Sequence, residues 1–212
     1  RIYVTEMVGG PTQMRVYDLG GRALGLVSTP EIALLSQAVR TVGDEVLVRS
    51  QSYTRPPAFY RYGPDAKELL PTALVHTSPA DFSDCEVRRE FATAFDGTKL
   101  PVNIIMRKGT KLDGSAPTLL YGYGSYGSSE QPYFEPRLKI WLEQGGIYVD
   151  ASVRGGGEYG DAWHAAARLG TKKVSMDDFA ACARYLVEKR YTSKEKRAGN
   201  IIELNDLREW LG

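Results

Sequence analysis

Short runs of alternating hydrophobic and polar residues mark the first third of the chain. Each run is bounded by turn signals such as GG, LGG and VGD, so five β-strands are predicted. They span residues 2–8, 13–19, 23–28, 45–52 and 58–62. Regularly spaced short strands are typical of β-propeller blades or of part of a β-sandwich. Two blades cannot close a ring, so we expect only part of a propeller here.

The pattern changes after the polar segment 77–81. Two longer strand-like runs follow, at 85–94 and 100–107. Between them lies Asp96-Gly97, a dipeptide that strongly favours a hairpin turn. We therefore expect these two runs to be neighbouring strands.

The second half of the chain alternates strand-like and helix-like segments. Apolar runs at 117–123 and 146–153 predict buried strands, and apolar spacing over 137–144 predicts a helix between them. A further helix is expected to start at Ser175, where Asp178 completes a capping box with aspartate in place of glutamate. This alternation predicts a parallel α/β sheet, whose ligand sites lie at the carboxyl ends of its strands.

Composition excludes several classes of partner. The 212 residues include 27 basic and 26 acidic side chains, a net charge of +1 spread along the chain, so no nucleic-acid partner is expected. No apolar run approaches the roughly 20 residues of a membrane span, and no signal-peptide pattern is visible. We expect no membrane partner and a cytoplasmic location, with the periplasm as the alternative. Cys85 and Cys182 lie far apart in sequence and are expected to be core thiols.

The two histidines provide no recognisable site. His76 falls in the loop between the two regions, and His164 lies in the sequence DAWHAAARLG. Neither has a serine, a cysteine or a second histidine at a useful spacing, so both are interpreted as structural. Because ligands are too few for a metal centre, we expect no metal and no cofactor.

A serine set among glycines and tyrosines, Ser125, resembles a hydrolase nucleophile. The nucleophile elbow has the pattern G-x-S-x-G, and here Gly127 fits whereas Tyr123 replaces the first glycine. An elbow also runs directly into a helix, but residues 128–136 have the composition of a loop. Ser125 is therefore not expected to be a nucleophile.

A second motif matches the sequence pattern of a dinucleotide-binding fingerprint. Gly155, Gly157 and Gly160 satisfy G-x-G-x-x-G directly after a predicted strand. The mechanism also needs an acidic residue about 20 positions on, at the end of the next strand, but Asp177 and Asp178 instead open a helix. We favour glycines that let a loop pack closely beneath the strand ends, and nucleotide binding is kept as an alternative.

Three motifs in order carry a family resemblance. LLYGYGSYG, RGGGEYGDAWH and DDFAACARYLVEKRYTS resemble consecutive signatures of the prolyl oligopeptidase family of serine peptidases. The resemblance covers residues 2–193. It implies an α/β fold, namely part of an α/β-hydrolase domain preceded by the terminal strands of a β-propeller. We assign residues 1–78 to the propeller strands and 79–198 to the hydrolase part.

The resemblance also implies a substrate and two site residues. Family members cleave short peptides on the carboxyl side of proline, so proline-containing peptides are the expected partners. Tyr123 matches the family tyrosine that donates to the oxyanion hole. Tyr126 takes the place of an aromatic residue that lines the substrate pocket. The motif YGYGSYG also resembles oligopeptidase B, which cleaves after basic residues. Whether cleavage follows proline or a basic residue therefore stays open.

The end of the sequence departs from the family. After Thr192-Ser193 the family has a glycine-rich elbow that bears the nucleophile, but here residues 199–212 read as a short amphipathic helix. We expect a truncated chain that lacks the nucleophile, acid and base and is inactive alone. Exposed sheet edges of such a chain favour self-association. A natural, non-catalytic binding product of the same fold is the alternative.

Overall fold

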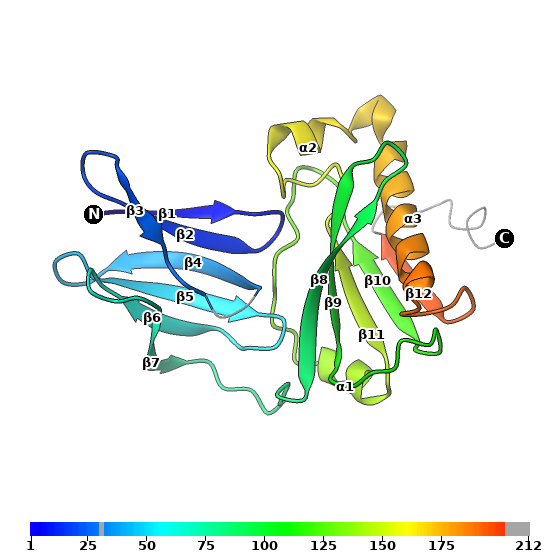
Figure 1. Ribbon diagram of the computed structural model, residues 1–212, viewed down its shortest axis with the longest axis horizontal. Coiled ribbons are helices and arrows are strands. Elements are labelled where there is room, and N and C mark those ends of the chain that lie inside the picture. The colour runs from blue at the N-terminus through cyan, green and yellow to red at the C-terminus, as the bar shows by residue number, and fades with distance from the viewer. Residues whose placement is uncertain (30–31, 202–212) are drawn as a thin grey trace. The chain divides into compact units, whose positions relative to one another are not determined.

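The computed structural model describes residues 1–29 and 32–201, and the chain divides into two compact units (Figure 1). Unit 1 comprises Arg1–Val87 and Gln131–Trp141, and unit 2 comprises Arg88–Glu130 and Leu142–Gly212. Three β-sheets account for most of the regular structure.

Unit 1 contains two antiparallel sheets. The first has the order β1-β2-β3 and the second the order β4-β5-β6-β7, so each is a meander of sequence neighbours. Their buried side chains, among them Met14, Leu35 and Val48, form one hydrophobic cluster. The strands are β1 (Ile2–Met7), β2 (Thr12–Tyr17), β3 (Ala23–Leu26), β4 (Ala33–Arg40), β5 (Val46–Ser52), β6 (Ala58–Tyr62) and β7 (Leu70–Val75).

All five strands predicted in this region are confirmed, but two others were missed. β4 has no simple alternation, because Gln37 has a φ of 49° and the pairing with β5 shifts between Ser36 and Val39. β7 contains Pro71, which argues against a central strand. Proline is tolerated because β7 forms the edge of its sheet.

The third sheet has the order β12-β10-β11-β9-β8. β10 runs parallel to both β11 and β12, whereas β9 is antiparallel to β11. The predicted parallel sheet therefore has a parallel centre and an antiparallel flank. The strands are β8 (Cys85–Thr93), β9 (Lys99–Arg107), β10 (Thr118–Gly122), β11 (Ile147–Ala151) and β12 (Arg197–Ile201).

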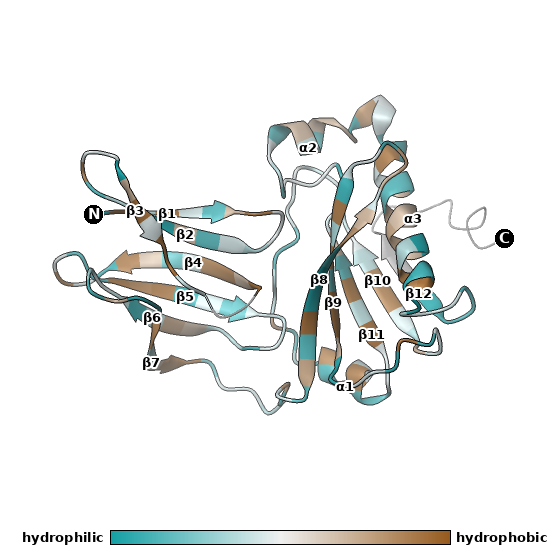
Figure 2. Ribbon diagram, in the orientation of Figure 1, coloured by the Kyte–Doolittle hydropathy of each residue, from teal (hydrophilic) through white to brown (hydrophobic). Residues whose placement is uncertain are grey.

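One long helix packs on this sheet. α3 (Lys173–Glu188) contacts β9 and buries Phe179, Cys182 and Leu186 in the cluster formed with the strands (Figure 1). Figure 2 shows hydrophobic and hydrophilic residues alternating along it, as an amphipathic helix requires. The shorter helices are α1 (Leu138–Glu143), α2 (Asp161–Ala165) and the 3₁₀ turn η1 (Leu169–Thr171).

The capping box predicted at the start of α3 is wrong. The helix begins at Lys173 with Lys172 at the N-cap, and no side chain caps it. Ser175 and Asp178 lie inside the first turns and are fully buried, and their side chains bond to Gly124 and Arg154 instead. Burial decides this outcome, because buried polar groups take the partners that the surrounding fold provides.

The end of the described chain also differs from expectation. β12 includes the first three residues of the segment 199–212 that was predicted to be helical. It pairs along the whole of β10 and so satisfies backbone groups of that strand. Residues 202–212, which include Leu204, Leu207 and Leu211 of the predicted helix, lie outside the described residues.

Both cysteines are buried free thiols, as expected from the sequence. Within residues 1–29 and 32–201, no group of three or more His, Cys, Asp and Glu side chains is arranged to hold a metal ion. In the same ranges, no helix combines the length and the apolar character needed to cross a membrane.

Candidate functional site

Two loops leave the carboxyl ends of adjacent parallel strands in unit 2. β10 ends at Gly122 and β11 at Ala151, so residues 123–130 and 152–160 follow at the same edge of the sheet. The loops are hydrogen-bonded to each other, from Gly127 N to the Gly155 carbonyl (3.0 Å) and from Gly157 N to the carbonyl of residue 128 (3.2 Å). The edge that the sequence identified as the ligand side of the sheet is thus where both motifs meet.

The glycines of the second loop permit this contact. A Cβ on Gly155 would lie 2.1 Å from the Gly124 oxygen, and one on Gly157 would lie 2.3 Å from the Gly127 oxygen. Both glycines therefore face carbonyl groups of the neighbouring loop, which would repel a phosphate. Close packing is thus confirmed for Gly155 and Gly157, whereas a Cβ on Gly160 would meet nothing within 4 Å. The five-residue α2 offers only a short helix to a nucleotide.

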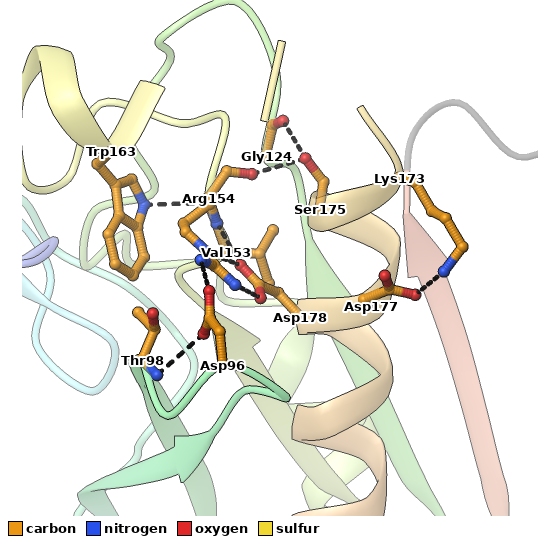
Figure 3. Close-up of polar contacts among 10 residues, drawn as sticks. All are labelled: Asp96, Thr98, Gly124, Val153, Arg154, Trp163, Lys173, Ser175, Asp177 and Asp178. Carbon is orange, nitrogen blue, oxygen red and sulfur yellow. Dashed lines mark hydrogen bonds and ion pairs between the residues drawn. The ribbon is translucent and has the colours of Figure 1, made fainter. Parts of the chain in front are cut away.

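A buried ion pair joins the second loop to α3. Arg154 donates from Nε to Asp178 Oδ2 (2.8 Å) and from Nη2 to Oδ1 (2.6 Å), and its backbone N–H also reaches Asp178 (3.1 Å) (Figure 3). The side chains are 12% and 0% exposed. The third guanidinium nitrogen donates to Asp96 in the turn between β8 and β9. One arginine therefore connects three segments that are far apart in sequence.

The charges of this cluster are mutually stabilised. Hydrogen bonding to Asp178, and then to Asp96, raises the pKa of Arg154 above its usual value. The Arg154 guanidinium and the Thr98 hydrogen bonds hold the pKa of the Asp96 carboxyl well below its usual range. Arg154 and Asp96 therefore keep opposite charges across the physiological pH range.

The first loop contains the three residues singled out from the sequence. Ser125 is 5% exposed, and its Oγ accepts a hydrogen bond from Lys172 Nζ, so the hydroxyl is not presented to solvent. Tyr123 is half-buried directly after β10. Tyr126 is 81% exposed and has a φ of 56°, a left-handed conformation that is uncommon for a tyrosine.

A second carboxylate, Glu158, is buried between the loops. It is 2% exposed; Oε1 accepts a hydrogen bond from Glu130 N (2.9 Å), and Oε2 has no hydrogen-bond partner among the described residues. Burial, with a smaller contribution from the Glu130 charge, raises the pKa of Glu158 to about 7. Burial also raises the pKa of Glu130, and it raises that of Tyr121 to about 12. Glu158 is therefore shielded from solvent, whereas Glu130 and Tyr121 are half-buried.

The two histidines lie in different settings. His164 Nδ1 lies 2.8 Å from the Gly155 carbonyl, which is an acceptor, so this nitrogen carries the proton. The neighbouring Trp163 donates from Nε1 to the Val153 carbonyl (3.1 Å). Both contacts fasten α2 to the glycine loop. His76 is exposed in the loop after β7, in unit 1.

Sequence reasoning missed the residues that hold the site together, namely Arg154, Asp178 and Lys172. One signal was available, because Arg154 directly follows an apolar run and a charge next to a buried strand needs a partner. Its partner in α3 lies 24 positions away, and the sequence alone does not identify it.

Comparisons with known proteins agree with the motifs. The profile of the prolyl oligopeptidase family matches residues 132–199. The prolyl endopeptidase of Elizabethkingia meningoseptica is 36% identical over 199 residues, which are 92% of this chain and 28% of that protein. The chain belongs to the prolyl oligopeptidase family. It spans 28% of the length of this relative.

Solved structures of the prolyl oligopeptidase family have the same fold. A structure from a study of two prolyl endopeptidases matches with a TM-score of 0.81 and 34% identity, covering 93% of this chain and 31% of that one. Prolyl oligopeptidase B of Galerina marginata, bound to a 35-residue hydrolysis and macrocyclization substrate, matches with a TM-score of 0.84 and 29% identity. That match covers 94% of this chain and 29% of the other.

The two carboxylates that bind Arg154 should contribute very differently to stability. Asp178→Asn should lower the free energy of unfolding by about 3–5 kcal/mol, because the guanidinium loses its buried counter-charge and keeps only the exposed Asp96. Asp96→Asn should cost about 1 kcal/mol or less, because Asp96 is 51% exposed. Urea unfolding followed by intrinsic tryptophan fluorescence would measure both. Equal losses would contradict this ranking.

Glu158 should make stability depend on pH. Its folded pKa of about 7 exceeds the ordinary 4.5, so the folded chain binds more protons and stability falls as pH rises from about 4.5 to 7. The fall is at most about 3 kcal/mol at 1.4 kcal/mol per pKa unit. Glu158→Gln keeps the acceptor for Glu130 N and should flatten the profile, whereas the raised pKa of Glu130 remains in both proteins. Parallel melting-temperature profiles over pH 4.5–7.5 would refute this assignment.

Proposed function

We propose that this chain is a segment of a prolyl oligopeptidase-type serine endopeptidase that cleaves short peptides after proline. Tyr123 carries this proposal. It directly follows β10, the middle one of the three parallel strands, and the carbonyl of the next residue, Gly124, is held by hydrogen bonds. A phenol O–H on such a rigid support can stabilise the oxyanion that develops when a peptide bond is attacked. Removing one such donor in other enzymes costs about 2.7–4 kcal/mol.

Tyr126 is the second residue of this proposal. Its ring is exposed at the same edge of the sheet, and its left-handed backbone costs free energy that an ordinary surface tyrosine would not require. We assign to it the aromatic contact with the substrate. The peptide bound to the Galerina marginata relative supports a peptide as the partner of the whole enzyme.

The architecture assigned to the chain follows from the same family. Residues 1–78 would form the last strands of a β-propeller, for which the four-stranded meander β4-β5-β6-β7 is a suitable blade. Residues 79–198 would form the first part of an α/β-hydrolase domain. In this arrangement the oxyanion donor lies on this chain and the nucleophile on another part of the enzyme.

Tyr123→Phe should lower kcat by about 10²–10³-fold with little change in KM, because an oxyanion donor acts only in the transition state. The measurement is steady-state cleavage of a succinyl-Gly-Pro reporter by an active full-length enzyme that carries this segment. Tyr159→Phe is the matched control, because it also removes one phenol oxygen from unit 2 while keeping the ring that packs at a tilt against Trp163. An unchanged kcat in Tyr123→Phe would contradict the oxyanion role and indicate that Tyr123 is a structural residue.

The isolated 212-residue chain should not cleave the same reporter. Ser125 is 5% exposed with its Oγ bound by the Lys172 ammonium, and the ring of His164 is bonded to the Gly155 carbonyl and not to a serine, so the two residues do not form a nucleophile–base pair. The measurement is reporter release by the purified chain with and without diisopropyl fluorophosphate. Robust turnover that this reagent abolishes would overturn the proposal that the nucleophile lies elsewhere.

A further inference from the structure

The carbonyl of Gly124 is held by two side-chain donors. Lys172 Nζ donates to it over 2.7 Å, and Ser175 Oγ lies 3.1 Å from it. Gly124 directly follows Tyr123, and its carbonyl belongs to the peptide group between Gly124 and Ser125, the second peptide group after the Tyr123 Cα. Both donors come from the start of α3, 48 and 51 positions further along the chain.

Lys172 is the stronger of the two donors. Ser175 Oγ also lies 2.6 Å from the Arg154 carbonyl, and a hydroxyl has only one proton to donate (Figure 3). The shorter contact favours Arg154 as its acceptor. The ammonium of Lys172 has three protons, of which one serves Gly124 and one serves Ser125 Oγ. A charged donor also makes the stronger hydrogen bond.

The surroundings leave the Gly124 peptide little freedom. A Cβ on Gly124 would lie 2.6 Å from Val153 Cγ2, and a Cβ on Gly155 would lie 2.1 Å from the Gly124 oxygen. The carbonyl is therefore packed against the second loop as well as hydrogen-bonded to α3. Loss of the main donor leaves a buried acceptor that is only partly satisfied, and rotation of the peptide group is the way to relieve it.

The position of Lys172 in the helix argues for a role outside the helix. It occupies the N-cap of α3, where the positive end of the helix dipole disfavours a cation. The next lysine, Lys173, resolves the same conflict by pairing with Asp177 on the exposed face. Lys172 instead directs its charge at the loop that carries Tyr123.

We propose that Lys172 is a positioning residue for the oxyanion donor, acting through the Gly124 carbonyl. This inference rests on the proposed role of Tyr123. The ammonium restrains the peptide group between Gly124 and Ser125, and this restraint, together with the strand pairing of β10 before Tyr123, limits rotation of the backbone that carries the phenol. A displacement of the phenol by about 1 Å would weaken its bond to the oxyanion without preventing substrate binding.

The test compares adjacent lysines in an active full-length enzyme that carries this segment. Lys172→Met keeps most of the aliphatic stem and removes the donor, and kcat should fall by about 10–100-fold with KM little changed. Lys173→Met, at a side chain that is 81% exposed, should leave kcat within about twofold. In the Tyr123→Phe background, Lys172→Met should cause almost no further loss, because the residue that it positions has already lost its hydroxyl.

The outcomes separate this inference from the proposed function. If Tyr123→Phe leaves kcat unchanged, the role of Tyr123 is wrong. If Tyr123→Phe lowers kcat but Lys172→Met has no effect, or multiplies the loss fully in the double variant, positioning by Lys172 is wrong. Should Lys172→Met fail to fold, Lys172→Gln carries the test, because its shorter, neutral amide is a weaker donor to the Gly124 carbonyl than the ammonium. A kcat loss of about threefold that vanishes in the Tyr123→Phe background is expected, and a loss that persists there would overturn the inference.

Discussion

The arrangement of the site depends on the ion pair between Arg154 and Asp178. Two charged groups buried to this degree lose most of their hydration, and a close pair of this kind adds little net stability compared with well-packed apolar residues. The contribution of the pair is to hold segments of the chain in place relative to one another. It joins the loop after β11 to the second turn of α3, and through Asp96 it also reaches the turn between β8 and β9. The register of α3 against the sheet is fixed by the same contact that orients the loop.

That register brings the start of α3 to the first loop. With Asp178 held by Arg154, Ser175 and Lys172 lie one and two turns nearer the N-terminus, where both reach the Gly124 carbonyl. The glycines of the second loop are the steric counterpart of this arrangement. Gly155 must lack a side chain because the Gly124 carbonyl occupies the position of its Cβ. Electrostatic and packing requirements therefore act on the same few atoms.

The sequence predicted the elements better than it predicted their contacts. Apolar runs located β10 and β11 to within about two residues, and the amphipathic spacing located α3, because these patterns follow from burial of one face. β4 and β7 were missed because a bulge and a proline interrupt the alternation. The capping box failed for another reason, since a local rule was applied to residues whose partners are distant. Nothing near Lys172 in the sequence indicates a glycine carbonyl 48 positions earlier.

A phenol donor poses a specific problem of rigidity. Its oxygen lies at the far end of a side chain, so a small rotation of the backbone displaces the oxygen by much more than it displaces the Cα atom. A strand restrains the backbone before Tyr123, but β10 ends at Gly122 and hydrogen bonding along the sheet stops there. The residue after the tyrosine is a glycine with a φ of 61°, the residue type with the widest conformational freedom. Restraint must therefore come from outside the strand, and a charged donor supplied by a neighbouring helix is strong enough to provide it.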